Sequence, residues 1–109
     1  MANTFKLKTK ANVGVTTVGI YTAPAATTTV VIGITMANTA GSGVNVGDGI
    51  TRAGTTEDLK LLKNAPIPQG SSLEFMAGNK IVLEATDTVT VDSDTNNSID
   101  AALTIMEIT

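Results

Sequence analysis

The chain has 109 residues and a formal charge of −3 at pH 7, from seven Lys and Arg against ten Asp and Glu. It contains no Cys and no His, which excludes disulfide scaffolds, thiol nucleophiles, Cys/His zinc sites and His-based acid–base catalysis. One Tyr, two Phe and no Trp leave few rings for stacking on bases or sugars, and the mild acidity argues against nucleic-acid binding through bulk charge. We therefore expect one domain over residues 1–109 that needs no cofactor and binds no nucleic acid.

The first predicted element is a strand at 4–10, in which Lys6, Lys8 and Lys10 fall on alternate positions. Alternate side chains of a strand share a face, so the three amines are expected on one side. This row could dock an acidic neighbour or nucleic acid. It could also be a solvated row that protects an edge strand from unwanted pairing, which is favoured because three charges hold a phosphate backbone only weakly. The lysines also interrupt the apolar run that a signal peptide requires, and no window holds the roughly 20 apolar residues of a membrane helix, so no membrane contact is expected.

Strand-forming residues dominate the rest of the chain. Thr occurs 19 times, and Val and Ile are frequent; β-branched side chains pack well on a pleated surface but lose rotamer freedom in helices. In 28–38, the side chains of Val30, Ile32, Ile34 and Met36 are predicted to share one face. The pattern predicts about eight short strands and a longer last one, at 4–10, 15–21, 28–38, 43–51, 58–64, 71–76, 80–85, 87–92 and 98–108.

Short strands at regular spacing, with turn signals between them, are typical of an all-β sandwich or barrel. We expect a single antiparallel β-sandwich, jelly-roll or immunoglobulin-like, because the two topologies share this strand count and differ in connection order. A helical turn would also suit the apolar spacing in 56–63, but a strand is preferred there. Two prolines exclude 66–70 from a central strand, and 77–80 and 94–97 are predicted turns.

Two loop segments resemble binding motifs without completing them. Asp92, Asp94 and Asn96 have the spacing that opens a calcium loop, but Asn97 replaces its Gly and Leu103 its final Glu. The glycine-rich segment 41–49 lacks the order of a phosphate loop and a following helix, so hairpin connections are expected there.

One pair of carboxylates resembles a catalytic pair. Glu74 and Glu84 fall in adjacent predicted strands and could flank a glycosidic bond, but the chain lacks the aromatic residues that line a sugar groove. We therefore predict no catalytic residue and no metal site, and a protein that is not an enzyme.

Several segments resemble small virion structural proteins of tailed bacteriophages, especially contractile-tailed phages of cyanobacteria. Their N-terminal half is similar to MANTFK, VGIYTAP and the strand TVVIGI with its following Ala37-Asn38. Their second half is similar to the proline-bounded segment APIPQGSSLE, to KIVLEA with Asp87, and to the closing IMEI. The resemblance covers nearly the whole chain, is weakest at 41–58, and implies a β-sandwich present in many copies on a particle.

From this resemblance we expect a non-enzymatic capsid decoration or cement protein, located in the virion and assembled in the host cytoplasm. Its expected partners are the major capsid protein or other virion proteins, together with further copies of itself. Alternatives are a neck, tail or baseplate component, or a receptor- or carbohydrate-binding module. Deletion of 41–49 is expected to leave the fold intact. The expected contact residues are Lys6, Lys8, Lys10, Asn45, Asp48, Arg52, Pro66, Ile67 and Pro68.

Overall fold

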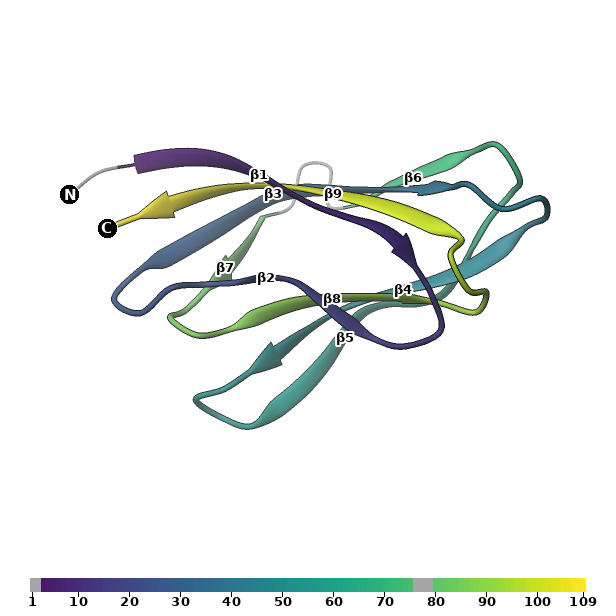
Figure 1. Ribbon diagram of the computed structural model, residues 1–109. Helices are drawn as coiled ribbons and strands as arrows, with labels where there is room; N and C mark the ends of the chain where they lie inside the picture. Colours follow the sequence, from purple (N-terminus) through teal and green to yellow (C-terminus); the bar gives the residue numbers. More distant parts are fainter. Residues whose placement is uncertain (1–2, 76–79) are drawn as a thin grey trace.

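The computed structural model describes residues 3–75 and 80–109 of the chain. Within these residues, nine strands form two antiparallel sheets that face each other (Figure 1). In the same part of the chain, no helix is long and apolar enough to cross a membrane. The strands are β1 (Asn3–Val13), β2 (Val18–Thr22), β3 (Thr28–Asn38), β4 (Val44–Arg52), β5 (Glu57–Ile67), β6 (Ser72–Phe75), β7 (Ile81–Leu83), β8 (Thr88–Ser93) and β9 (Ile99–Ile108).

The strand order is that of a jelly roll. Sheet A has the order β1-β9-β3, with β6 and β7 paired end to end along the far side of β3; sheet B has the order β2-β8-β4-β5. If β6 and β7 are taken as one strand position, the first strand pairs with the last, the second with the next-to-last, and so on to the central β4–β5 hairpin. Such nested pairs, rolled into two sheets, define the jelly roll and decide against the immunoglobulin-like alternative.

The predicted strands are confirmed, and each predicted range overlaps one observed strand. Strand is also confirmed for 57–63, which lies in β5. The turn at 94–97 is present; positions 77–79 of the other predicted turn lie outside the described residues.

The face predicted for β3 is only half correct. Ile34 and Met36 are buried between the sheets, as are Ile99, Leu103 and Ile105 of β9. However, the pairing of β3 with β9 shifts register between Val31 and Gly33. A bulge of this kind reverses which side chains face inward. Val31 is therefore buried, whereas Val30 and Ile32 lie on the outer face and are only half-buried.

Candidate interaction surfaces

The lysine row of β1 lies on the inner side of sheet A, the side that faces β2 of sheet B. Lys6 Nζ lies 2.8 Å from Glu107 Oε1, and Lys8 Nζ lies 6.0 Å from the centre of the Tyr21 ring. Lys10 is exposed. The opposite side of the strand carries Phe5 and Leu7, which are 68% and 64% exposed. The three lysines thus share a side, as predicted, but Lys6 neutralises a carboxylate of its own chain.

Glu107 is the centre of a small buried polar network. Tyr21 Oη donates to Glu107 Oε2 at 2.6 Å and also bonds Thr29 Oγ1 at 2.8 Å. The hydrogen bond from Lys6, followed by that from Tyr21, lowers the pKa of Glu107. Burial, reinforced by the hydrogen bond to Glu107, raises the pKa of Tyr21 to about 12. Glu107 therefore stays ionised and well partnered beneath β1.

The glycine-rich segment 41–49 lies mostly in a central strand, as the strand predicted at 43–51 requires, and not in hairpin connections. β4 lies between β8 and β5, and Val44, Val46 and Ile50 all point into the core. A Cβ at Gly47 would collide with Asp92 Oδ1, and one at Gly49 with the carbonyl of Leu59. The glycines permit close approach of neighbouring strands, not loop flexibility. The expectation that 41–49 could be deleted without loss of the fold is therefore wrong, because most of β4 would be removed.

Asp48 is not a surface contact residue. Its position on β4 places it in the inward-facing series of Val46 and Ile50, and it is only 2% exposed. Its Oδ1 has no hydrogen-bond partner among the described residues. Burial raises the pKa of Asp48 to about 7, against the opposing effect of a backbone hydrogen bond from Gly49. The prediction of Asp48 as a contact residue is wrong, because within the strand predicted at 43–51 it shares the alternate positions of the inward-facing Val46 and Ile50.

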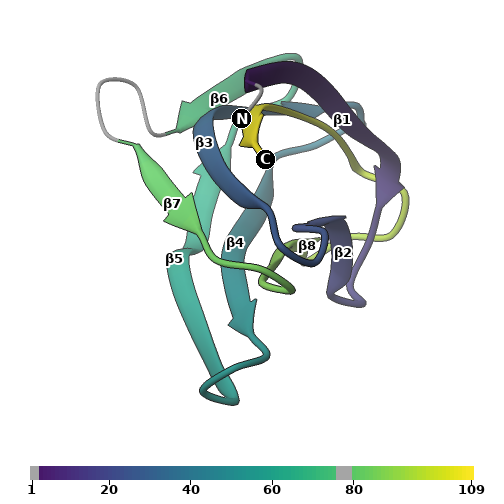
Figure 2. The ribbon, with the colours of Figure 1, turned by 90° about the vertical axis from the view of Figure 1, so that its left-hand side faces the viewer.

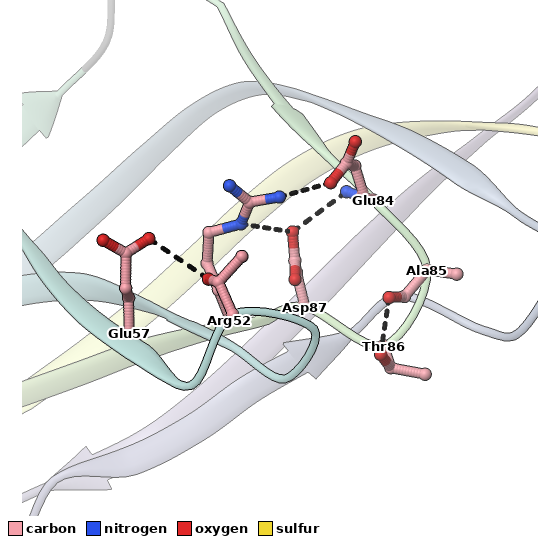
Figure 3. Close-up of polar contacts among 7 residues, drawn as sticks. Arg52, Glu57, Glu84, Ala85, Thr86 and Asp87 are labelled. Carbon is pink, nitrogen blue, oxygen red and sulfur yellow. Dashed lines mark hydrogen bonds and ion pairs between the residues drawn. The ribbon is translucent and has the colours of Figure 1, made fainter.

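Arg52 ties the end of β4 to the turn between β7 and β8 (Figure 3). Its Nη2 pairs with Glu84 Oε1, and its Nε lies 3.4 Å from Oδ2 of the buried Asp87. The Asp87 carboxylate also accepts the backbone N–H of Glu84 at 3.0 Å. Glu57, at the first position of β5, is the register partner of Arg52, and its Oε1 accepts a hydrogen bond from Thr55 Oγ1 at 3.1 Å. The Arg52 side chain is thus held within its own chain, at the rim of a groove between β5 and β7.

The other predicted contact residues lie around the end of sheet B. Pro66 and Pro68 are exposed, and Pro66 sits in β5, an edge strand where a missing N–H is tolerated. Ile67 is 1% exposed and packs in the core, so its prediction as a contact residue was wrong. Asn45 is exposed, and its backbone N–H donates to Asp94 Oδ1 at 3.1 Å.

The carboxylates of Asp92 and Asp94, in the segment that resembles a calcium loop, accept hydrogen bonds from residues of the same chain. Asp92 Oδ2 accepts from Thr17 Oγ1 at 2.9 Å. Within residues 3–75 and 80–109, no group of three or more acidic side chains is placed to hold a metal ion. The prediction that Glu74 and Glu84 lie on adjacent strands is wrong. β6 and β7 do not pair with each other but follow one another along the same side of β3.

A surface that the sequence reasoning missed is the outer face of sheet A. One row of directly opposed residues crosses four strands, from Phe5 through Met106 and Val30 to Val82. The end residues Phe5 and Val82 are 68% and 59% exposed. Among the outward-facing strand residues of this sheet that the structure describes, only Glu74 and Asp100 are charged. The exposed Phe5 and Leu7 were visible in the sequence, but the β3 bulge that brings Val30 beside them was not.

No family model matches the chain, and no curated protein matches its sequence. Solved structures do share its fold. A chain of the Bacillus endospore appendages, described as a family of disulfide-linked pili, aligns with a TM-score of 0.57 and 16% identity over 99% of this chain and 87% of that one.

Two virus chains are also similar in fold. A chain of the T13 viral particle of IBDV aligns with a TM-score of 0.59 and 12% identity over 96% of this chain. A chain of infectious bursal disease virus, strain Gx, aligns with a TM-score of 0.55 and 12% identity, again over 96% of this chain. The present chain spans 30% and 36% of the length of these two proteins. At this level of identity, the similarity defines a shared β-sandwich fold.

Proposed function

We propose that this chain is a non-enzymatic structural protein of a virion, and specifically that it decorates the outer capsid shell of a tailed bacteriophage in many copies. The observation that carries the proposal is the apolar row from Phe5 to Val82 on the nearly uncharged outer face of sheet A. A monomer in water gains nothing from exposing such a row, whereas a protein that binds a larger surface buries it there. The partner is the major capsid protein, and the site of action is the virion, assembled in the host cytoplasm.

Two further observations support a structural role. The sequence resembles virion proteins of tailed phages, and chains of similar fold belong to a virus particle and to pili. The present chain has no Cys, so it cannot be attached through disulfides, unlike pili that are described as disulfide-linked. Many modest contacts on a symmetric shell would together give tight binding through avidity. Because only the assembled shell is bound, binding would stabilise that shell.

The location is tested by immunogold electron microscopy of intact particles with an antibody against this chain, together with its copy number by quantitative mass spectrometry. We expect label distributed over the head and a copy number in the range of the capsid subunits. Label confined to the neck or tail, with a few copies per particle, would contradict capsid decoration and favour a ring component.

The contact face is tested by rebinding purified protein to particles that lack it. The double substitution Phe5→Ser and Leu7→Ser should lower occupancy at least about tenfold, since a buried large apolar side chain contributes about 1.5–3 kcal/mol. Val15→Ser is the matched control, because Val15 is 56% exposed but lies between β1 and β2. Equal occupancy of the two variants would show that sheet A does not face the shell.

A further inference from the structure

The outer face of sheet A carries two parallel rows of very different side-chain size. Figure 2 shows β1 and β6 of this sheet along the top of the molecule with sheet B beneath them, so the outer face is turned away from the rest of the sandwich. The first row is the apolar row from Phe5 to Val82, whose end residues project into solvent. The second, which we call the low row, lies four positions further along β1 and consists, in strand order, of Thr9, Ala102, Thr35 and Glu74.

Two hollows lie along the low row. One is at the β3 bulge and is bordered by Gly33, Ala102 and Thr104. The other lies nearer to β1 and is bordered by Thr9, Ala37 and Ala102. Small side chains leave these positions open, whereas Phe, Met and Val fill the matching positions of the apolar row. The face is therefore raised in one half and hollow in the other.

These two halves fit each other in a two-fold arrangement. The level of Leu7 and Thr104, which are opposed in the β1–β9 register, lies midway between the rows. Rotation by a half-turn about an axis along this level, in the plane of the contact, places the apolar row of one copy over the low row of the other. Met106 then lies over Ala102 of the second copy, and the symmetry makes this contact twice. The facing strands remain aligned, as in other packed sheets.

The size and charge of the face also suit a second copy. Its four strand positions and about eight residues of length cover about 500 Å² per copy, so a dimer would bury about 1,000 Å², the lower limit of specific interfaces. Its charges lie at the margins and alternate in sign. Asp100 borders the same hollow as Lys10, and Glu74 lies on the same edge as the exposed Lys80. The face therefore brings no large charge of one sign to its own copy.

We propose that two copies of the free chain form a two-fold dimer through the outer faces of sheet A, with the apolar row of each copy in the hollows of the other. The capsid shell is proposed above to bind the same face, so the second copy and the shell compete for it. The dimer keeps the apolar row out of water until the chain reaches a particle. An interface of this size is weak enough to open there. The competition rests on the proposed function, whereas the dimer is a property of the purified chain.

The dimer is tested by exchanging side-chain size on β9 and measuring association by sedimentation equilibrium. Ala102→Met places a Met opposite Met106 of the other copy, and Met106→Ala leaves a cavity opposite Ala102; both faults occur twice. Each variant alone should dimerise at least about tenfold more weakly than the wild type. In an equimolar mixture every Met again lies opposite an Ala, so a heterodimer should form about as tightly as the wild-type dimer.

The double variant Ala102→Met with Met106→Ala provides a second measurement, because it restores both contacts within one kind of chain and should dimerise as the wild type does. Thr51→Met, a similar enlargement on the outer face of sheet B, is the control and should not change dimerisation. Circular dichroism checks that each variant is folded. The proposal is overturned by a wild type that stays monomeric, by single variants that dimerise as well as the wild type, or by a mixture that associates no better than its components.

The competition with the shell is tested on particles that lack the chain. Because the chain has no Cys, Thr104→Cys provides one thiol per copy beside the two-fold axis. Packed sheets lie about 10 Å apart, which is too far for a disulfide but within reach of a short bismaleimide. Linked dimers should fail to rebind, whereas the unlinked variant should rebind as the wild type does. Linked dimers that rebind equally well would overturn the competition. A wild type that does not rebind at all would contradict the proposed function and leave the dimer standing.

Discussion

The outer faces of the two sheets carry different side chains, although the strands of both follow the same jelly-roll wrapping. A row across sheet B runs through Thr22, Thr88, Thr51 and Asp58, and the first two hydroxyls bond each other at 2.9 Å. The corresponding row across sheet A runs through Phe, Met and Val. Thr, Val and Phe all favour strands. The choice among these residues therefore leaves the fold unchanged. It decides whether an outer face is polar and well hydrated or apolar and suited to contact with a partner.

The sheets also differ in how they bury a carboxylate. Glu107 of sheet A is held by Lys6 and Tyr21, whereas Asp48 of sheet B has an oxygen without a hydrogen-bond partner in the described structure. A buried charge is tolerated when it is paired and hydrogen-bonded, and is costly otherwise.

The largest effect is expected at Asp48. Its pKa of about 7 in the folded chain lies above its ordinary value of 3.8, so the folded state binds more protons between these limits. Its contribution therefore becomes more unfavourable as pH rises from about 4 to about 7, by roughly 4 kcal/mol in all. Asp48→Asn should remove this dependence and stabilise the chain at pH 8 by a comparable amount. Urea unfolding at several pH values measures this effect, and Asp58→Asn, at an exposed position, is the control. If Asp48→Asn and the wild type had the same dependence of unfolding free energy on pH, the prediction would be contradicted.

The second largest effect on stability is expected at Gly49, where β4 and β5 of sheet B approach each other closely. Gly49→Ala would press a methyl group against the carbonyl of Leu59 and should cost about 3 kcal/mol in unfolding free energy. Gly41→Ala is the control, since a Cβ there meets open space, and its effect should stay within about 0.5 kcal/mol. Similar denaturant midpoints for both variants would show that β4 and β5 can separate without cost.

A smaller loss is expected when Glu107 loses one of its partners. Lys6→Met should destabilise the fold by about 2 kcal/mol, because it leaves the buried carboxylate with a single strong donor. The pKa of Glu107 is lowered in the folded state, so this stabilisation is present at neutral pH and disappears as pH falls through the depressed value. The wild type and Lys6→Met should therefore converge in acid. Lys10→Met is the control and should change the unfolding free energy little, because Lys10 is an exposed lysine of the same strand.

These contrasts also show how far the sequence could be interpreted. Period-two alternation and turn residues located the strands, because those signals are local. The jelly-roll order could not be derived, since it depends on pairings between strands far apart in the sequence. The two errors on the strand faces have different causes. The bulge after Val31 becomes visible only when β9 is placed, whereas the alternation of Val46, Asp48 and Ile50 is present in the sequence, and Asp48 was misplaced because an unpaired carboxylate is rarely buried.

The candidate surfaces were predictable to a similar extent. The lysine row was found because its residues lie close together in the sequence, but its inward partner Glu107 lies at the other end of the chain. The row from Phe5 to Val82 combines four strands. No single segment contains enough of it to indicate an interaction surface.

The smallest effect on stability is expected on the outer faces themselves. Phe5→Thr with Leu7→Thr should change the unfolding free energy by less than about 1 kcal/mol, because both side chains are largely exposed and Thr also favours strands. The same variant should elute earlier in hydrophobic-interaction chromatography. The reverse exchange, Thr22→Val with Thr88→Val on sheet B, should elute later while the fold is kept. If the Thr substitutions on β1 instead unfold the chain, the apolar face of sheet A belongs to the core and is not a surface kept for a partner.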